Sequence, residues 1–224
     1  MKNKKQQRLR IAVDGPAASG KHTLARQIAK KYKLLHLDSG KLYRYFALQV
    51  YQTKGQKVNY TKLKQVLKKL TLKKLKDKRL TSEPVTKIAS IISKIKKIRQ
   101  MLKKVQHDLA YNPPKKFKGS ILDGRDIGTV IMPDAHVKVY LTASLNVRAV
   151  RRYKEYKKMG VKTTLNKVKS DIKKRDYEDT HRKISSLKPA KDAVLLDSSF
   201  YNTRTAFVEI DEVIRKRIKL LNAT

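Results

Sequence analysis

A glycine-bounded loop lies near the N-terminus and limits the folds that this chain can adopt. Residues 15–21 read Gly-Pro-Ala-Ala-Ser-Gly-Lys, which is the pattern G-x-x-x-x-G-K. An apolar run at 10–14 precedes the loop, and apolar residues at helical spacing follow it over 23–33. A strand, such a loop and a helix in succession present backbone N–H groups and a helix N-terminus to phosphate oxygens. We therefore predict a nucleotide phosphate site, with the Lys21 ammonium reaching the terminal phosphates.

The residue after this lysine departs from the usual form of the motif. Ser or Thr commonly follows the lysine, whereas this chain has His22, with Thr23 next. His22 is open to two interpretations: a contact to phosphate or metal, or a first-turn helix residue that points to solvent, which we favour. The Thr23 hydroxyl is the better candidate for a neighbour of Mg²⁺ or phosphate, and the sequence identifies no other metal ligand.

The remainder of the chain predicts a parallel α/β fold. Four further strand-length apolar segments lie at residues 34–38, 120–123, 137–141 and 193–197. They alternate with helical patterns, which we expect at 145–158, at 160–175 and in an amphipathic segment at 210–221. Short apolar strands that alternate with helices favour a three-layer α/β sandwich around one five-stranded parallel sheet. The length of 224 residues fits one domain, or one core with an insertion.

A lysine-rich segment interrupts the alternation at residues 41–112. It holds no clear strand, and two apolar stripes at helical spacing predict amphipathic helices. The stripes are Leu63, Val66, Leu67 and Leu70, then Ile91, Ile95, Ile98 and Leu102. Pro84 breaks the segment and Asn112-Pro113-Pro114 ends it. We predict a helical insertion packed on the main sheet.

The charge of the chain is strongly positive. There are 41 lysines and 15 arginines against 18 acidic residues, so the formal net charge is +38. Such a balance passes the electrostatic test for a nucleic-acid binder. The lysines, however, are spread over nearly every predicted helix, whereas specific readers gather arginines and aromatic residues on one face. We favour a solvated lysine surface, and binding of a polyanion stays open as the alternative.

Other features of the composition exclude several classes of protein. Cysteine is absent, which excludes disulfides, cysteine metal sites and thiol catalysis, and fits a reducing cytosol. No apolar run approaches the roughly 20 residues that a membrane span needs. The charged N-terminus is followed by a strand-length run only, so we expect neither a signal peptide nor a membrane segment.

Polar clusters follow the predicted strands, where open α/β sheets bind ligands. Residues 38–44 follow the second strand and residues 123–126 the third. Further along, Arg175, Asp179 and Arg182 have the spacing i, i+4, i+7, which predicts one shared helical face. The preceding basic helix carries Arg148, Arg151 and Arg152. Arginine forks suit phosphate oxygens during transfer, although any single Arg–Asp pair could be a surface salt bridge worth about 0–1 kcal/mol.

Taken together, these motifs resemble those of bacterial cytidylate kinases, small monomeric nucleoside-monophosphate kinases. The resemblance covers about residues 10–220 and is carried by IAVDGPAASGKHTLA, LDSGKLYR, DGRDIGTVIMPDA with VKVYLTAS, KRDYEDTHR and LKPAKDAVLLDSS. It implies a cytoplasmic monomer that transfers a phosphoryl group from ATP to CMP or dCMP with Mg²⁺. It also implies one P-loop kinase domain over 1–224: a core at 8–45 and 118–224, a helical NMP-binding insert at about 46–117 and a lid at about 153–175.

The resemblance further implies roles for individual residues. ATP would be bound by Gly15, Pro16, Ala17, Ala18, Ser19, Gly20, Lys21, His22 and Thr23. CMP would be bound by Ser39, Arg44, Ser90, Arg99, Arg125, Asp126, Arg175, Asp179 and Arg182. The catalytic residues would be Lys21, Arg125, Arg151, Arg152 and Arg182. Cytosine would be read by Ser90, Arg99 and Asp126, because a carboxylate can accept from the 4-amino group and a guanidinium can donate to the N3/O2 edge.

The sequence also departs from this family. His22 replaces a glycine, Thr81 stands where arginine is common, and residues 199–209 are longer than usual. The segment at 70–81 leaves little room for the small antiparallel sheet of the family's insert. Three other functions stay open: another small-molecule P-loop kinase, a basic RNA- or ribosome-associated nucleotide switch, and an inactive kinase. We favour the cytidylate kinase because its base-reading residues are present and no switch loop is recognisable.

Overall fold

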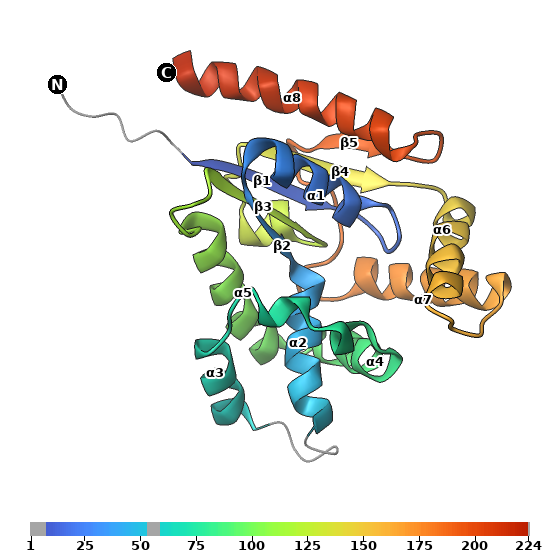
Figure 1. Cartoon of the computed structure of the whole chain (residues 1–224). Helices are drawn as coiled ribbons and strands as arrows, with labels where there is room; N and C mark the ends of the chain where they lie inside the picture. The colour runs from blue at the N-terminus through green and yellow to red at the C-terminus, as the bar shows by residue number, and fades with distance from the viewer. Residues whose placement is uncertain (1–7, 53–58, 224) are drawn as a thin grey trace. The chain divides into compact units, whose positions relative to one another are not determined.

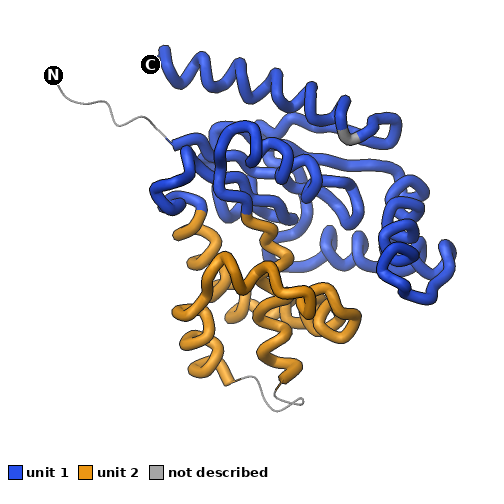
Figure 2. Tube along the Cα trace, in the orientation of Figure 1, with its two compact units in different colours: residues 1–36, 110–224 blue, residues 37–109 orange. Residues whose placement is uncertain are grey.

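The computed structural model describes residues 8–52 and 59–223, so the basic tail at 1–7 lies outside the described part. The chain divides into two compact units (Figure 2). Residues 1–36 and 110–224 form the first unit, and residues 37–109 form the second.

One five-stranded sheet has the strand order β2-β3-β1-β4-β5 (Figure 1). Its strands are β1 (Leu9–Asp14), β2 (Leu35–Asp38), β3 (Gly119–Gly124), β4 (Val137–Thr142) and β5 (Val194–Asp197). Strand β1 pairs in parallel with β3 and β4, and β4 pairs in parallel with β5. The five predicted strands and the parallel α/β fold are confirmed, each strand to within one residue at either end.

Two helices cover one face of this sheet, α1 (Lys21–Tyr32) and α8 (Thr203–Ala223). Each helix contributes apolar residues four apart to a single buried cluster with the strands. The cluster includes Leu24 and Ile28 of α1, Ile210 and Ile214 of α8, and Ile11, Val13 and Val139 of the sheet. Alternate residues of β1 point away from this face, toward the short π-helix η3 (Ile127–Ile131), which contacts β1 and β3.

A helical pair follows β4. Helix α6 (Leu145–Lys158) matches its predicted range, and α7 (Leu165–His181) begins and ends later than the predicted 160–175. The start of α7 is set by Thr164, whose hydroxyl accepts from the Lys167 N–H at 3.2 Å. The two helices share a small apolar cluster around Ala149, Val168 and Ile172.

The second unit is helical. It contains α2 (Ser39–Gln52), α3 (Tyr60–Lys68), the 3-10 turns η1 (Lys74–Lys76) and η2 (Lys78–Thr81), α4 (Glu83–Ile92) and most of α5 (Lys96–Tyr111). Helix α2 packs against α4 and both 3-10 turns. Over residues 59–109, all of which are described, no strand forms, as the sequence predicts. The end of α5 at Tyr111 confirms the stop expected at Asn112.

The second predicted stripe does not lie on one helix. Ile91 belongs to α4 and is 64% exposed, whereas Ile98 and Leu102 lie on α5 and are buried. Between the helices, the Ser93 hydroxyl donates to the Ser90 carbonyl at 2.8 Å, which turns the chain out of α4. Pro84 lies in the first turn of α4, where no backbone N–H is needed, so it begins a helix as well as ending the preceding segment.

The first stripe is also shorter than predicted, because α3 ends at Lys68 and leaves Leu70 outside it. None of the helices in the described part is both long and apolar enough to cross a membrane.

Candidate nucleotide-binding site

The G-x-x-x-x-G-K loop joins the end of β1 to the start of α1, as predicted. Gly15 cannot be replaced without movement, because a Cβ there would lie 2.0 Å from the Leu141 carbonyl oxygen of β4. Gly20 caps α1 with φ of +92°, and no side chain caps this helix. The Lys21 ammonium donates to the Pro16 carbonyl at 2.9 Å, so it lies against the loop.

Asp14 fixes the base of the loop. Its two carboxylate oxygens accept from the N–H groups of Ile127 and Gly128 at 2.8 and 2.7 Å, which joins β1 to η3. Burial raises the pKa of Asp14 to about 6, and the two backbone bonds offset part of that rise. The sequence interpretation missed this residue, although a carboxylate directly before the first glycine was a visible signal.

Arg151 of α6 lies on the loop. Its guanidinium donates to the Ser19 carbonyl at 3.3 Å, to the Ser198 hydroxyl at 2.9 Å and to the Ser198 carbonyl at 2.7 Å. The Ser198 hydroxyl in turn donates to Ser19 and to Thr142 of β4. Ser198, just after β5, was also missed, because nothing local in the sequence connects it with residue 19.

Arg148 and Arg152, the other arginines of α6, make different contacts from Arg151. Arg148 is buried and donates to the carbonyls of Ala143 at 2.8 Å and Ala17 at 3.3 Å, and it forms an ion pair with Asp176 of α7. It therefore connects α6, α7 and the loop. Arg152 pairs with Glu155 of its own helix at 3.0 Å and is about one third exposed.

Arg125 and Arg182 enclose Asp179. The Arg125 Nε lies 2.8 Å from one carboxylate oxygen, and the Arg182 Nη1 lies 3.4 Å from the other. Burial raises the pKa of Asp179, but the charges of Arg125, Arg175 and Arg182 outweigh it and hold the pKa below its usual value. The structure thus brings together Arg125, Asp179 and Arg182, three of the residues predicted to act at this site.

The prediction that Arg175, Asp179 and Arg182 share one helical face is wrong for Arg182. Helix α7 ends at His181, and Arg182 has the extended φ and ψ of −65° and 139°. Its Nε donates to the Ser185 carbonyl at 2.6 Å. The side chain reaches Asp179 by bending back from the segment after the helix.

Asp126 is buried directly before η3. Its backbone carbonyl accepts from Val130 at 2.9 Å and Ile131 at 3.2 Å, which fixes the turn after β3. The negative charge of Asp126 also contributes to the raised pKa of Asp14.

The second unit carries the other predicted CMP residues. Ser39 is the buried first residue of α2, and the Arg44 guanidinium lies 3.0 Å from the carboxylate of Asp38. Arg99 is buried, lies over the Tyr43 ring at 5.7 Å and donates to the Ser93 carbonyl at 3.1 Å. Ser93 also bonds to the Ser90 carbonyl, so Ser90 and Arg99 are connected through one residue.

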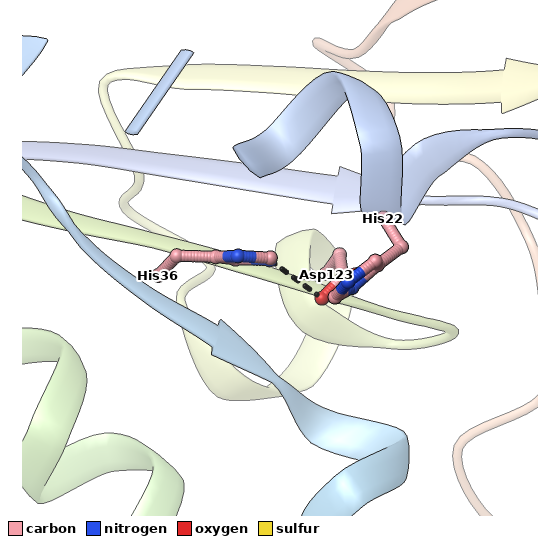
Figure 3. Close-up of side chains that lie close together, drawn as sticks. All are labelled: His22, His36 and Asp123. Atoms are coloured by element: carbon pink, nitrogen blue, oxygen red, sulfur yellow. Dashed lines mark hydrogen bonds and ion pairs between the residues drawn. The ribbon is translucent and has the colours of Figure 1, made fainter. Parts of the chain in front are cut away.

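His22 lies on the first turn of α1 with a side chain that is 44% exposed, as the favoured interpretation expects, but its ring also lies close to a carboxylate. Its Nδ1 lies 3.6 Å from an Asp123 carboxylate oxygen, and its ring centroid lies 5.0 Å from that of His36 (Figure 3). The His36 Nε2 lies 3.2 Å from the other Asp123 oxygen. Helix α1 packs over β3, and this packing places its first turn at the end of that strand. His36 was missed as a site residue.

Burial raises the pKa of Asp123, but the two imidazoles outweigh this effect and hold the pKa well below its usual value. Asp123 is therefore a buried carboxylate that stays ionised.

Known proteins are similar to this chain over most of its length. The profile of the family described as cytidylate kinase matches residues 11–221. A protein named cytidylate kinase from Bartonella bacilliformis is 42% identical over 214 residues, covering 94% of this chain and 98% of the relative. The cytidylate kinase of Streptococcus mutans is 39% identical over 207 residues, covering 85% and 89%.

Among solved structures, an uncharacterized protein from Eubacterium ventriosum aligns with a TM-score of 0.54 over 92% of this chain and 98% of its own. At 13% identity, this likeness supports the fold alone. The profile match and the extent of identity to named relatives lead to one conclusion: the chain belongs to the cytidylate kinase family.

Proposed function

We propose that the protein transfers the γ-phosphoryl group of ATP to CMP or dCMP, giving ADP and CDP or dCDP. The observation that carries this proposal is the G-x-x-x-x-G-K loop between β1 and α1, with Lys21 held against it, in a chain of the cytidylate kinase family.

The ATP phosphates are proposed to lie on residues 15–23. The uncapped start of α1 supplies backbone donors and the positive end of a helix dipole. The Ser19 hydroxyl is buried and makes no hydrogen bond within the described residues, so a phosphate oxygen would satisfy it. Arg151 already touches the loop at Ser19, which supports its proposed role beside the phosphates.

Mg²⁺ is proposed to enter on ATP. It prefers hard oxygen ligands, and the partly exposed Thr23 hydroxyl on the first turn of α1 fits that preference. Asp14 fits less well, because both of its oxygens accept backbone N–H groups. When bound, the ion would neutralise charge on the β and γ phosphates.

CMP is proposed to bind through the residues that the family resemblance implies. Arg44 would hold its phosphate, and Arg99 with Ser90 would face the base. Asp126 would accept from the cytosine 4-amino group. Uracil presents the opposite donor pattern there and would leave a buried group unpaired.

The cluster around Asp179 is proposed to contact the ribose and the phosphate oxygens whose charge changes during the transfer. Asp179 with Arg175 would bind the ribose, and Arg125 and Arg182 would clamp phosphate oxygens. The support is geometric: Asp179 already holds Arg125 and Arg182 in fixed positions, so they are preorganised.

The transfer needs no strong base. An oxygen of the CMP phosphate is already anionic; it forms a bond to the γ-phosphorus while the bond from that phosphorus to the β–γ bridging oxygen breaks, and ADP leaves. The protein's part is alignment, exclusion of water and neutralisation of charge by Lys21 and by Arg125, Arg151, Arg152 and Arg182.

The test is ADP release measured with ATP-Mg²⁺ and, separately, CMP, dCMP, UMP and AMP. Turnover confined mainly to CMP and dCMP is expected. No turnover with any of the four, in folded protein that still binds ATP, would overturn the proposal and favour an inactive kinase or a binding protein.

Asp126→Asn tests the base reader within the same assay. Its ratio of kcat/KM for CMP over UMP is expected to fall by at least about tenfold, equivalent to about 1.4 kcal/mol. Asp171→Asn is the control, because Asp171 is an exposed residue of α7 paired with Lys167. An unchanged ratio in Asp126→Asn would remove Asp126 from base reading.

Several finer features are part of the same proposal and await their own tests. They are the nucleotide-binding role of the insert at about 46–117, the lid at about 153–175, the monomeric state and the cytoplasmic location. Nucleic acid is not proposed as a substrate.

A further inference from the structure

We propose that His22, His36 and Asp123 bind a divalent transition-metal ion of the zinc class. The three residues come from separate elements of the first unit: the first turn of α1, strand β2 and strand β3. Figure 3 shows both imidazole rings directed at the carboxylate of Asp123. The proposed transfer of phosphate does not use this cluster as a whole, so the inference goes beyond it.

The spacing of the donor atoms fits a metal site. One potential ligand atom from each residue can be chosen so that all lie within 4.8 Å of one another. Zinc binds imidazole nitrogen and carboxylate oxygen at about 2.0–2.1 Å, which separates two tetrahedral ligands by about 3.3 Å. The His36 Nε2 lies 3.2 Å from one Asp123 oxygen and the His22 Nδ1 lies 3.6 Å from the other, so each imidazole is close to that separation from the carboxylate. Small side-chain rotations would bring all three onto one ion.

The kinds of donor select the class of ion. Mg²⁺ and Ca²⁺ prefer to be coordinated by oxygen ligands alone, whereas imidazole nitrogen suits zinc, copper, nickel and cobalt. Two histidines and one carboxylate are a three-ligand set that leaves a fourth position open to water or to an anion. This cluster is thus chemically distinct from the site proposed for Mg²⁺ at Thr23.

The environment also favours a cation. The Asp123 side chain is only 3% exposed, so its negative charge is buried, and a bound cation would compensate it at short range. His22 is 44% exposed and His36 is 15% exposed, which leaves a path from solvent on the His22 side. The net charge of +38 disfavours diffuse binding of cations elsewhere on the surface.

The position of the cluster gives the ion a structural consequence. His22 directly follows Lys21 of the phosphate loop. An ion held by all three residues would fix the first turn of α1 to β2 and β3, and would therefore restrain the helix that begins the loop site.

The experiment uses the full chain, without a polyhistidine tag, and Co²⁺ as an optical probe. Addition of Co²⁺ is expected to produce visible absorption bands that saturate at one ion per chain and disappear when Zn²⁺ is added. Isothermal titration with Zn²⁺ alone is expected to show the same 1:1 stoichiometry. Absence of saturable binding in either titration would overturn the proposal and leave Asp123 as an acceptor for two imidazoles.

Variants locate the site. His36→Leu and His22→Gly are each expected to weaken Zn²⁺ binding at least about tenfold, and His107→Ala, which removes an exposed histidine of α5, is expected to bind as the unaltered chain does. Equal binding by His36→Leu would overturn the assignment. Far-ultraviolet circular dichroism checks folding, and His36→Gln replaces His36→Leu if the latter is unfolded.

The kinase assay separates this proposal from the previous one. His36 has no part in the proposed transfer, so His36→Leu is expected to lose Zn²⁺ binding while it retains CMP-dependent release of ADP.

Discussion

The charged side chains around the loop are held in position by different kinds of hydrogen-bond and ion-pair partners. The Lys21 ammonium donates to the Pro16 carbonyl of the loop, and the Arg151 guanidinium donates to backbone or hydroxyl groups of Ser19 and Ser198. Asp179 is held by two arginines. An ammonium is a compact charge on a flexible stem and can follow a phosphate that moves, whereas a planar guanidinium with several bonds positions its neighbours.

Lys21→Ala is expected to lower kcat for ADP release with CMP by about 10²-fold or more, because the proposed transfer would lose the ammonium that neutralises charge on the phosphoryl group. The measurement is steady-state ADP release at saturating ATP-Mg²⁺. Lys30→Ala, an exposed lysine of the same helix, is the matched control and should keep its rate. A Lys21→Ala variant that retained most of its rate would remove the loop from the proposed chemistry.

Asp179 makes stability depend on pH. Its pKa is lowered in the folded state, so its stabilising contribution is present above the unfolded pKa of about 3.9 and is lost as pH falls through the lower folded value. Asp179→Asn is therefore expected to lower the free energy of unfolding by about 1–3 kcal/mol at pH 7, because two largely buried guanidinium groups lose their carboxylate partner.

That difference should shrink toward pH 3, and urea unfolding at the two pH values measures it. Asp171→Asn, in an exposed pair with Lys167, should change stability by no more than about 0.5 kcal/mol at either pH. An equal loss at pH 7 and pH 3 in Asp179→Asn would show that its charge is not the cause.

At the scale of elements, local signals set where most segments begin and end. Thr164 caps α7, Pro84 begins α4 and Gly20 ends the loop before α1. The turn at Ser93 that divides α4 from α5 has a weaker sequence signal, because the apolar spacing continues through it. The sequence therefore predicted one stripe where the structure has two helices. The end of α7 at His181 similarly takes Arg182 off the helix while leaving it in contact with Asp179.

The junction of β1 with the loop depends on Gly15. In Gly15→Ala, the new methyl group would meet the Leu141 carbonyl of β4 at 2.0 Å, so the strands must move apart or the loop must change. We expect a loss of about 2–5 kcal/mol in the free energy of unfolding, which combines backbone strain and overpacking. Urea unfolding monitored by circular dichroism measures it.

Gly160→Ala separates the two causes. Gly160 has φ of +72°, and a Cβ there would have no atom within 4 Å. Only the conformational cost of about 1–2 kcal/mol is then expected. If both variants lost the same amount, the collision with β4 would contribute nothing.

At the scale of the whole molecule, the dominant feature is the net charge of +38. Repulsion among the lysines opposes the compact state. Ion pairs could offset this repulsion, but the chain has only 18 acidic groups to form them. The core compensates through the apolar cluster between the sheet, α1 and α8.

Salt is therefore expected to stabilise the protein. Raising ionic strength from about 0.01 to 0.15 M shortens the Debye length from about 30 to about 8 Å, which screens repulsion more than it weakens close pairs. The Tm should rise by about 2–4 °C for each kcal/mol gained. Calorimetry in NaCl and in choline chloride should agree, and a Tm that fell with both salts would mean that attractive pairs dominate.

The sequence by itself determined the strand positions, the order of the elements, the place of the G-x-x-x-x-G-K loop between β1 and α1, and the family. These features depend on residues that are close together in the chain: apolar periodicity, glycines at a turn, and motifs of ten or so residues. The helical character of the segment at 59–109 was predictable for the same reason. Most site residues could be proposed only because they lie within such motifs.

Only the tertiary structure decided which distant residues meet. His22 and His36 gather on Asp123, Arg151 lies on Ser19 and Ser198, and Asp14 binds the backbone of η3. Residues of each group are brought together by the packing of α1 and α6 and by the order of the strands. Contacts across such separations depend on how whole elements pack, and local sequence patterns carry no record of that packing.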